Sequence, residues 1–231
     1  MEMHTLPVWE QWLKRMVWEQ LGRIQGKKIM DFGSGRGITA SYLAADNEVL
    51  AIEPSAEMLA ERWRERSYCQ WKGSTEKLRE LPNESFDVIV CHNVLEYAED
   101  RETIVREFER LLKTDGMISL VKHNRAGRVM QMAVLLNDFE QAFQLLDGED
   151  GRAAAHGKIH YFEDEAIECW SPGLKIVKTL GMRTFWDLQQ NQEVQKEACW
   201  QEEMLRLEQR VSEKEEYKAI AFFHHLLIQK R

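Results

Sequence analysis

Apolar and polar residues alternate along the first half of the chain with two different periods. From Leu6 to Ile24 the apolar residues recur every three or four positions, which predicts a helix with one apolar face that ends at Gly26. Five short apolar runs follow, and they indicate strands that are buried on both faces. These predicted strands are Lys27–Phe32, Glu48–Glu53, Tyr68–Gly73, Phe86–Cys91 and Gly116–Lys122.

Helical patterns separate these runs. A glycine-rich turn after the first strand leads into a helix over Ile38–Ala45, and Pro54 opens a second helix that we expect to reach about Arg66. Helices at Glu76–Leu81 and Arg101–Lys113 complete the series. Five strand-then-helix units indicate an α/β fold with a doubly wound, mostly parallel sheet and helices on both faces.

The rhythm changes after Lys122. We expect a helix over residues 126–146, a loop over 147–162, a short helix over 164–170 and a strand over 174–179. A glutamate-rich helix over about 190–213 then precedes a strongly apolar last strand, Tyr217–Ile228. No linker or internal repeat interrupts the chain. We therefore predict one domain, residues 1–231, with a seven-stranded sheet, an N-terminal helix within 1–25 and a small helical cap over 123–162.

Composition and charge narrow the function classes. With 31 basic and 39 acidic residues, the net charge of −8 lacks the basic field of a typical phosphate-backbone binder. The 4 cysteines form no C-x-x-C pair, which suits a reducing compartment. His156 and His160 lack an accompanying carboxylate or cysteine cluster, so we expect no metal. The chain shows no long apolar run and no signal-peptide pattern, so we expect a cytoplasmic protein without a membrane partner.

The turn after the first strand carries the clearest chemical signal. From Asp31 it reads D-F-G-S-G-R-G, and Glu53 ends the second strand 20 residues after Gly33. Glycines let a ligand approach the backbone closely, and a carboxylate at the end of the second strand bonds ribose hydroxyls in doubly wound folds. A dinucleotide and a nucleoside both fit this pattern. Asp31 favours a ligand with an ammonium group, as methionine-derived sulfonium cofactors have, because a carboxylate repels phosphates.

In combination these motifs resemble those of class I S-adenosylmethionine-dependent methyltransferases. The resemblance rests on the glycine-rich turn, on the acid that ends the next strand and on the run S-F-D-V-I-V-C-H-N-V-L-E-Y. It implies S-adenosylmethionine as the cofactor and S-adenosylhomocysteine as the product. It also implies that Asp31 orients the amino-acid end of the cofactor and that Glu53 binds the ribose hydroxyls.

The resemblance implies further cofactor-binding residues on four segments. These are Gly33, Ser34 and Gly35 under the cofactor with Gly37 closing the turn, Pro54 and Met58 beside the adenine, Thr75 and Glu76 at its amino edge, and His92 over the methionine portion.

Most of the chain is also similar to the methyltransferases that act on 5-carboxymethoxyuridine at the wobble position of tRNA. H-N-V-L-E-Y-A-E-D, K-H-N-R-A-G and G-M-R-T-F-W-D-L carry this similarity, with Trp12 in register. The similarity implies a carboxylate acceptor in tRNA. Three features differ. Pro7 stands where the subgroup has an arginine, His123 stands where it has an aromatic residue, and residues 147–162 carry few lysines.

The chemistry of methyl transfer suggests candidates on the acceptor side. A carboxylate acceptor is already anionic and needs a cation or N–H donors to align it, for which Arg183 is the first candidate, followed by Asn124 and Arg125. A hydroxyl or amine acceptor needs a base, and His123 or Glu96 is suited to that role. Three hypotheses stay open: transfer to tRNA, transfer to a small molecule, and a noncatalytic module that binds the cofactor and a partner.

Overall fold

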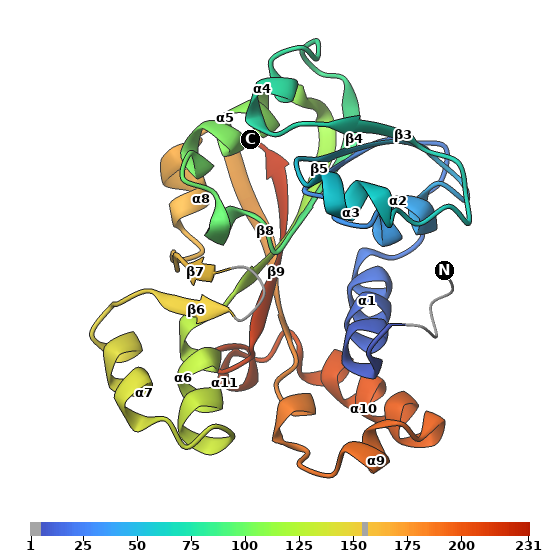
Figure 1. Ribbon diagram of the computed structural model, residues 1–231. Helices are drawn as coiled ribbons and strands as arrows, with labels where there is room; N and C mark the ends of the chain where they lie inside the picture. Colours follow the sequence, from blue (N-terminus) through green and yellow to red (C-terminus); the bar gives the residue numbers. More distant parts are fainter. Residues whose placement is uncertain (1–5, 154–156) are drawn as a thin grey trace.

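The computed structural model describes residues 6–153 and 157–231, which include one seven-stranded sheet (Figure 1). The strand order is β3-β2-β1-β4-β5-β9-β8. The strands span Lys28–Phe32 (β1), Glu48–Glu53 (β2), Cys69–Lys72 (β3), Phe86–His92 (β4), Leu112–His123 (β5), Leu174–Met182 (β8) and Phe223–Lys230 (β9). Strands β1 to β5 pair in parallel, whereas β9 runs antiparallel to both β5 and β8. The predicted α/β fold class with a mostly parallel sheet is confirmed.

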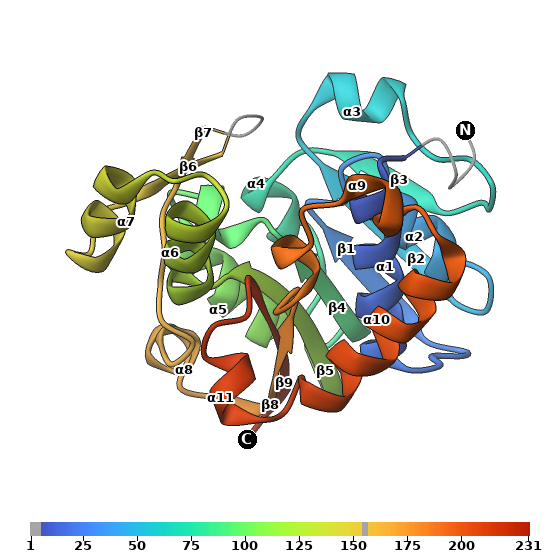
Figure 2. The same cartoon turned by 90° about the horizontal axis from the view of Figure 1, so that it is seen from below.

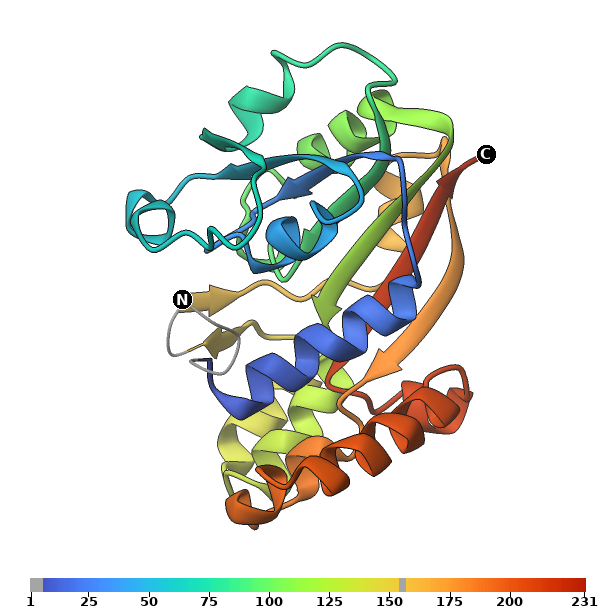
Figure 3. The same ribbon diagram turned by 90° about the vertical axis from the view of Figure 1, so that its right-hand side faces the viewer.

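Helices cover both faces of this sheet. One face carries α4 (Thr75–Leu78), α5 (Arg101–Leu111) and α8 (Ala166–Trp170). The other carries α1 (Val8–Leu21), α2 (Ile38–Leu43) and α10 (Ala198–Val211). Figure 3 shows α1 lying along the sheet with α10 beside it. The predicted N-terminal helix is therefore present but shorter, and residues 1–5 lie outside the described part.

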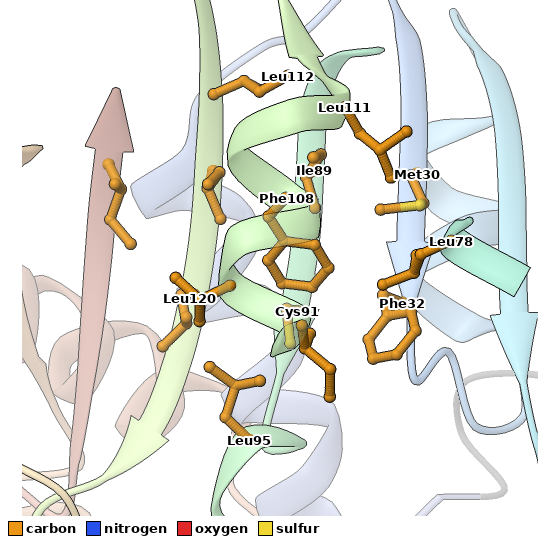
Figure 4. Close-up of a cluster of buried hydrophobic side chains, with 14 of the residues drawn as sticks. Met30, Phe32, Leu78, Ile89, Cys91, Leu95, Phe108, Leu111, Leu112 and Leu120 are labelled. Carbon is orange, nitrogen blue, oxygen red and sulfur yellow. The ribbon is translucent and has the colours of Figure 1, made fainter. Parts of the chain in front are cut away.

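The main core lies between α5 and the parallel strands. Phe108 and Leu111 of α5 face Met30 of β1, Ile89 of β4 and Leu120 of β5, and all five side chains are almost fully buried (Figure 4). Burial of such apolar side chains on both faces is the main favourable term in folding. It holds the ends of β1 and β4 in fixed positions at the edge where the candidate site lies.

The second predicted helix is shorter than expected. We predicted a helix to about Arg66, but α3 spans only Ala56–Ala60. The chain leaves the helix because the Trp63 side chain is buried against Leu6 and Ile38, and the Trp63 amide donates to the Arg36 carbonyl at 2.6 Å. Burial of one large side chain thus overrides the local helix propensity.

The predicted cap differs in detail from the structure. The single helix expected over 126–146 is two helices, α6 (Arg125–Val134) and α7 (Phe139–Leu146). Asn137 has a left-handed φ of 51°, and Asp138 begins α7 by accepting from the Gln141 amide at 3.0 Å. The expected loop over 147–162 contains paired strands β6 (Gly151–Ala153) and β7 (Gly157–Ile159). Figure 1 shows these four elements beyond the carboxyl end of β5.

The C-terminal prediction also needs correction. The helix expected over 190–213 is α9 (Gln192–Gln195) followed by α10. The last strand begins at Phe223, because the residues expected to start it include the short helix α11 (Glu215–Lys218). Tyr217 lies in α11, where its ring packs edge-on against Phe185 with centroids 5.6 Å apart.

A buried carboxylate holds the segment that follows β8. Glu208 on α10 is fully buried and accepts hydrogen bonds from the backbone amides of Thr184 at 3.0 Å, Phe185 at 2.9 Å and Trp186 at 3.2 Å. Burial raises the pKa of Glu208, and the three backbone bonds oppose that rise. Since α10 also lies beside α1 (Figure 2), Glu208 connects the helical layer to the short helix η3 (Trp186–Leu188).

We expect Glu208→Ala to lower the free energy of unfolding by about 3 kcal/mol or more, because three buried N–H groups lose their acceptor. Urea denaturation measures this change. The matched control is Glu203→Ala, which removes an exposed carboxylate that pairs with Arg206 at 2.8 Å on the same helix and should leave stability nearly unchanged. Equal losses in the two variants would contradict the anchoring role of Glu208.

Candidate functional site

The turn between β1 and α2 places backbone atoms at the carboxyl edge of the sheet. Gly33, Gly35 and Gly37 have φ angles of 71°, 56° and 74°, which side-chain-bearing residues rarely adopt. A Cβ at Gly33 would lie 2.3 Å from Val94, and one at Gly37 would lie 1.9 Å from the Tyr68 hydroxyl. At Gly35 no atom of the described residues, apart from its two chain neighbours, lies within 4 Å of the corresponding position. The middle of the turn therefore leaves room for a ligand to approach the backbone.

Glu53 joins this turn to the loop after β2. Its carboxylate is buried, and it accepts from the Gly35 amide at 2.8 Å and from the Ser55 amide at 2.9 Å. Each oxygen keeps a further lone pair for a ligand hydroxyl. Pro54 is exposed and Met58 is half-buried in the following segment. The structure thus brings Glu53 and the turn together, as the sequence predicted.

Asp31 lies at the end of β1 beside a cation that the sequence analysis missed. Burial raises its pKa to about 6, while the Lys14 ammonium of α1 and an N–H bond from Ala40 oppose the rise. The Lys14 ammonium donates to the Thr39 hydroxyl at 3.3 Å, and burial lowers the pKa of Lys14. The only sequence signal for Lys14 is its place next to the buried stripe of a helix. An acid and a base together suit a zwitterionic group.

Several buried polar atoms at this edge have no hydrogen-bond partner among the described residues. They are Asp31 Oδ2, Ser34 Oγ, Thr75 Oγ1 and Asn93 Oδ1. Each follows or ends β1, β3 or β4, so all four belong to the carboxyl edge. Unpaired buried polar atoms are rare in native proteins because each is costly. They fit a polar ligand such as a nucleoside that carries an amino-acid group.

Two further predicted cofactor residues lie near the same edge but differ in burial. Glu76 is exposed, and its carboxylate accepts from the Ser74 amide at 3.0 Å. The backbone bond from Ser74 is the main reason that the pKa of Glu76 is lowered. His92, the last residue of β4, is partly buried and shares a hydrogen bond of 2.8 Å with Ser119.

A second group of polar side chains lies where β4 and β5 end. Glu96, in the short helix η2 (Leu95–Tyr97), is almost fully buried and accepts from the His123 amide at 3.0 Å. Burial raises the pKa of Glu96 to about 7. The Tyr97 hydroxyl and His123 Nε2 are 3.3 Å apart. The structure therefore brings the two predicted bases, Glu96 and His123, into one cluster.

Arg183 lies close to two aromatic rings that also contact His123. Its guanidinium is within 5.5 Å of the ring centroids of Phe222 and Phe223, which also contact the His123 ring. Arg183 forms an ion pair with Asp187, yet its Nε and Asp187 Oδ2 are buried without a partner among the described residues. Both residues line a cavity of about 30 Å³ between α6 and η3. A buried donor and a buried acceptor thus belong to two side chains that line one small pocket.

Asn124 has a structural use that the sequence did not predict. Its Nδ2 donates to the carbonyls of Ala219 and Ala221, both at 2.9 Å, and its Oδ1 accepts from the Ala126 amide at the start of α6. These bonds fix the entry to the cap and use both donors of the amide. Arg125 likewise donates to the Leu145 and Glu149 carbonyls.

The metal and membrane expectations can be compared only with the described residues. Within 6–153 and 157–231 no group of three or more histidine, cysteine, aspartate or glutamate side chains is arranged to hold a metal ion. His160 pairs with Asp150 at 2.9 Å, whereas His156 lies outside the described part. No helix in that same part is long and apolar enough to cross a membrane.

Comparisons with known proteins agree with this fold. Residues 30–120 match a family described as a methyltransferase domain. A tRNA 5-carboxymethoxyuridine methyltransferase of Escherichia coli is 25% identical over 93% of this chain and 87% of its own length. A ubiquinone biosynthesis O-methyltransferase of Klebsiella pneumoniae is 30% identical, but over 51% of each chain. A putative methyltransferase structure from Listeria monocytogenes covers 94% of this chain and 99% of its own, with a TM-score of 0.62 and 14% identity.

The strand order with a reversed β9 and the glycine-rich turn after β1 define the class I methyltransferase fold. Residues 30–120 of this chain match the methyltransferase domain family, and the chain as a whole shares the fold of S-adenosylmethionine-dependent methyltransferase structures.

We expect stability to fall between about pH 4.5 and pH 7 because of Glu96. The raised pKa means that the folded state keeps a proton that the unfolded state has lost. The stabilisation that this proton gives is fully present below the pKa of Glu96 in the unfolded chain. It is lost as pH rises through the pKa of Glu96 in the folded protein, by up to about 3 kcal/mol. Glu96→Gln should therefore gain stability relative to wild type between pH 4.5 and pH 8 in urea denaturation.

The control for the loss of a carboxylate near the same turn is Glu99→Gln, because Glu99 is exposed. A difference between Glu96→Gln and wild type that stays constant with pH would show that Glu96 does not titrate in this range.

Proposed function

We propose that the carboxyl edge of β1, β2 and β4 holds S-adenosylmethionine through the residues that the sequence indicated. The open backbone at Gly35 lies under the cofactor, and the remaining lone pairs of Glu53 accept the ribose hydroxyls. The adenine lies among Pro54, Met58, Thr75 and Glu76. Asp31 accepts from the ammonium group, and Lys14 is well placed to donate to the carboxylate of the methionine half.

The proposed acceptor is the carboxylate of a modified wobble uridine in tRNA. The observation that carries this proposal is Arg183, whose guanidinium already holds one carboxylate, that of Asp187, and whose Nε has no partner among the described residues. Arg128 of the cap interacts electrostatically with Asp187 and Tyr97 and adds a second cation to the cluster. Asp187 Oδ2, which has no donor within the described part of the chain, is a matching acceptor for an N–H or O–H group of a nucleoside.

The likeness to the tRNA methyltransferase also supports this acceptor. It extends over 93% of the chain and so includes the segments that contain Arg183, Asp187 and Phe222. The likeness to the ubiquinone methyltransferase covers 51% of the chain. The share of the chain that is covered therefore favours the tRNA acceptor.

The proposed mechanism is a direct displacement. Bound S-adenosylmethionine supplies a methyl group on a positively charged sulfur. The acceptor oxygen forms the new bond to carbon as the carbon–sulfur bond breaks, and the electron pair stays on sulfur to give S-adenosylhomocysteine. A carboxylate needs no base, so the work of Arg183 and Arg128 is to hold it in line. In this mechanism Glu96 and His123 line the acceptor side of the site.

A second candidate is methyl transfer to a hydroxyl of a small molecule. The pairing of Glu96 with His123 favours it, because a carboxyl whose pKa is about 7 can accept a proton near neutral pH. The net charge of −8 also favours a small acceptor over a polyanion.

We expect Glu53→Ala to weaken S-adenosylhomocysteine binding by about tenfold or more, since a hydrogen bond to a buried charge is worth about 1.5 to 3 kcal/mol. Isothermal titration calorimetry measures the affinity. The control is Glu48→Ala at the opposite end of β2, where the exposed carboxylate pairs with Lys28 at 3.6 Å. Unchanged affinity in a folded Glu53→Ala protein would refute the cofactor site.

The acceptor is tested by transfer of a radiolabelled methyl group from S-adenosylmethionine. Bulk tRNA and small metabolites from a host strain that lacks the gene are offered separately. We expect label in tRNA, with an apparent affinity for tRNA that falls steeply with salt. We expect Arg183→Ala to bind the cofactor normally but to lose most of the transfer.

Label only in the metabolite fraction would overturn the tRNA acceptor in favour of the second candidate. Label in neither fraction, with cofactor bound, would favour a noncatalytic module. Full transfer by Arg183→Ala would remove Arg183 from the acceptor site, while the exposed Arg206→Ala on α10 serves as the control for loss of a surface arginine.

A further inference from the structure

Four polar side chains form a hydrogen-bonded chain across the sheet, from α1 to the end of β4. Gln20 Oε1 lies 2.8 Å from His225 Nδ1, and His225 Nε2 lies 2.8 Å from the Ser119 hydroxyl. The Ser119 hydroxyl lies 2.8 Å from His92 Nε2. The chain connects α1, β9, β5 and β4, and its last member is at the carboxyl edge.

The direction of the protons in this chain follows from its far end. Gln20 Nε2 donates to the Gly181 carbonyl at 3.4 Å, and a carbonyl can only accept, so Gln20 Oε1 must face His225. His225 Nδ1 therefore carries a proton and donates it to Gln20. The remaining question is whether His225 carries a second proton on Nε2.

Burial favours the neutral form of both histidines. His225 and Ser119 are fully buried, and burial lowers the pKa of His225 to about 3. The pKa of His92 is lowered well below its usual value by burial, and then by His225 and Lys14, the titratable groups that face it. Both rings are therefore neutral at neutral pH and carry one proton each.

With one proton on each imidazole ring and one on the Ser119 hydroxyl, only one arrangement of hydrogen bonds is possible along this chain. Since His225 Nε2 is bare, it accepts the only proton of the Ser119 hydroxyl. The Ser119 oxygen then accepts from His92 Nε2–H, which leaves His92 Nδ1 bare. Among the described residues, the His92 ring forms its hydrogen bond through Nε2, and the residue is only partly buried, which leaves Nδ1 available to a ligand.

Strand register places this bare nitrogen near the proposed methionine end of the cofactor. Asp31 of β1 pairs with Val90 of β4, and His92 follows Val90 by two residues, so Asp31 and His92 lie on the same face of adjacent strands. Val90 also pairs with Ser119, which puts the relay on that face. Lys14 of α1 interacts electrostatically with both Asp31 and His92.

We infer that the chain Gln20–His225–Ser119–His92 positions the methyl donor by holding His92 in the Nε2–H tautomer, so that its bare Nδ1 accepts a hydrogen bond from the cofactor's ammonium group. This inference rests on the proposed cofactor site. Asp31 and His92 are then two acceptors for one ammonium, and Ser119, His225 and Gln20 are positioning residues that act through His92.

The tautomer is tested by NMR on the ¹⁵N-labelled full chain at pH 7 without ligand. Correlations between ring nitrogens and carbon-bound protons distinguish a bare nitrogen from a protonated one, and His92→Gln assigns the signals. We expect His92 to be neutral with a bare Nδ1. A charged His92, or one with the proton on Nδ1, would overturn the inference.

The effect on the cofactor is tested with two ligands. S-adenosylhomocysteine has the ammonium group, whereas methylthioadenosine lacks the amino-acid half. We expect Ser119→Ala to weaken S-adenosylhomocysteine by about tenfold, as loss of a charged hydrogen bond does, and to leave methylthioadenosine within about twofold. Ser212→Ala, which removes another buried hydroxyl bonded at 2.9 Å to the Gln209 carbonyl, should change neither affinity.

Equal weakening of both ligands would show a general structural defect and would overturn the inference. If Ser119→Ala does not fold, Gln20→Met tests the same chain from the partly exposed helix α1, and it should weaken S-adenosylhomocysteine while leaving methylthioadenosine within about twofold. Wild-type protein that bound neither ligand would refute the proposed cofactor site itself, whereas the tautomer measurement decides separately whether the relay exists.

Discussion

The candidate site depends on one constraint of parallel sheets, which is that β1, β2 and β4 all end at the same edge. Backbone that leaves this edge loses its ladder partners and must find others. Glu53 supplies two of them, because its carboxylate accepts from Gly35 in one loop and Ser55 in the next. The geometry of the glycine-rich turn and the geometry of the loop after β2 are therefore coupled through one side chain, which is also the proposed ligand of the ribose.

Three buried acids differ in whether their hydrogen bonds are satisfied within the protein. Glu208 receives three backbone N–H bonds, so its charge is compensated within the protein and it acts as an anchor. Asp31 and Glu96 each keep one buried oxygen without a partner among the described residues, and burial raises the pKa of both. An acid left partly unsatisfied lowers stability, which is acceptable where a ligand completes its bonds.

The parallel half of the molecule was predictable because its signals are local. Apolar runs predicted β1 to β5 within a few residues, and the spacing from Gly33 to Glu53 predicted which side chains meet at the edge. The failures came from contacts between distant segments. Burial of Trp63 against Leu6 and Ile38 ended α3 early, and no local pattern encodes it. Lys14 and the Ser119–His225 contact were missed for the same reason, since each joins residues far apart in sequence.

The division between these halves also explains why the cofactor is better defined than the acceptor. The family match ends at residue 120, and it includes the glycine-rich turn, Glu53 and His92. Arg183, Asp187 and Phe222 lie beyond it, on segments held in place by Glu208, Asn124 and β9. An acceptor that binds there contacts residues whose positions depend on long-range packing, so related chains can keep the cofactor chemistry while changing the acceptor. We propose that Arg183 Nε and Asp187 Oδ2, which have no hydrogen-bond partner among the described residues, select the acceptor.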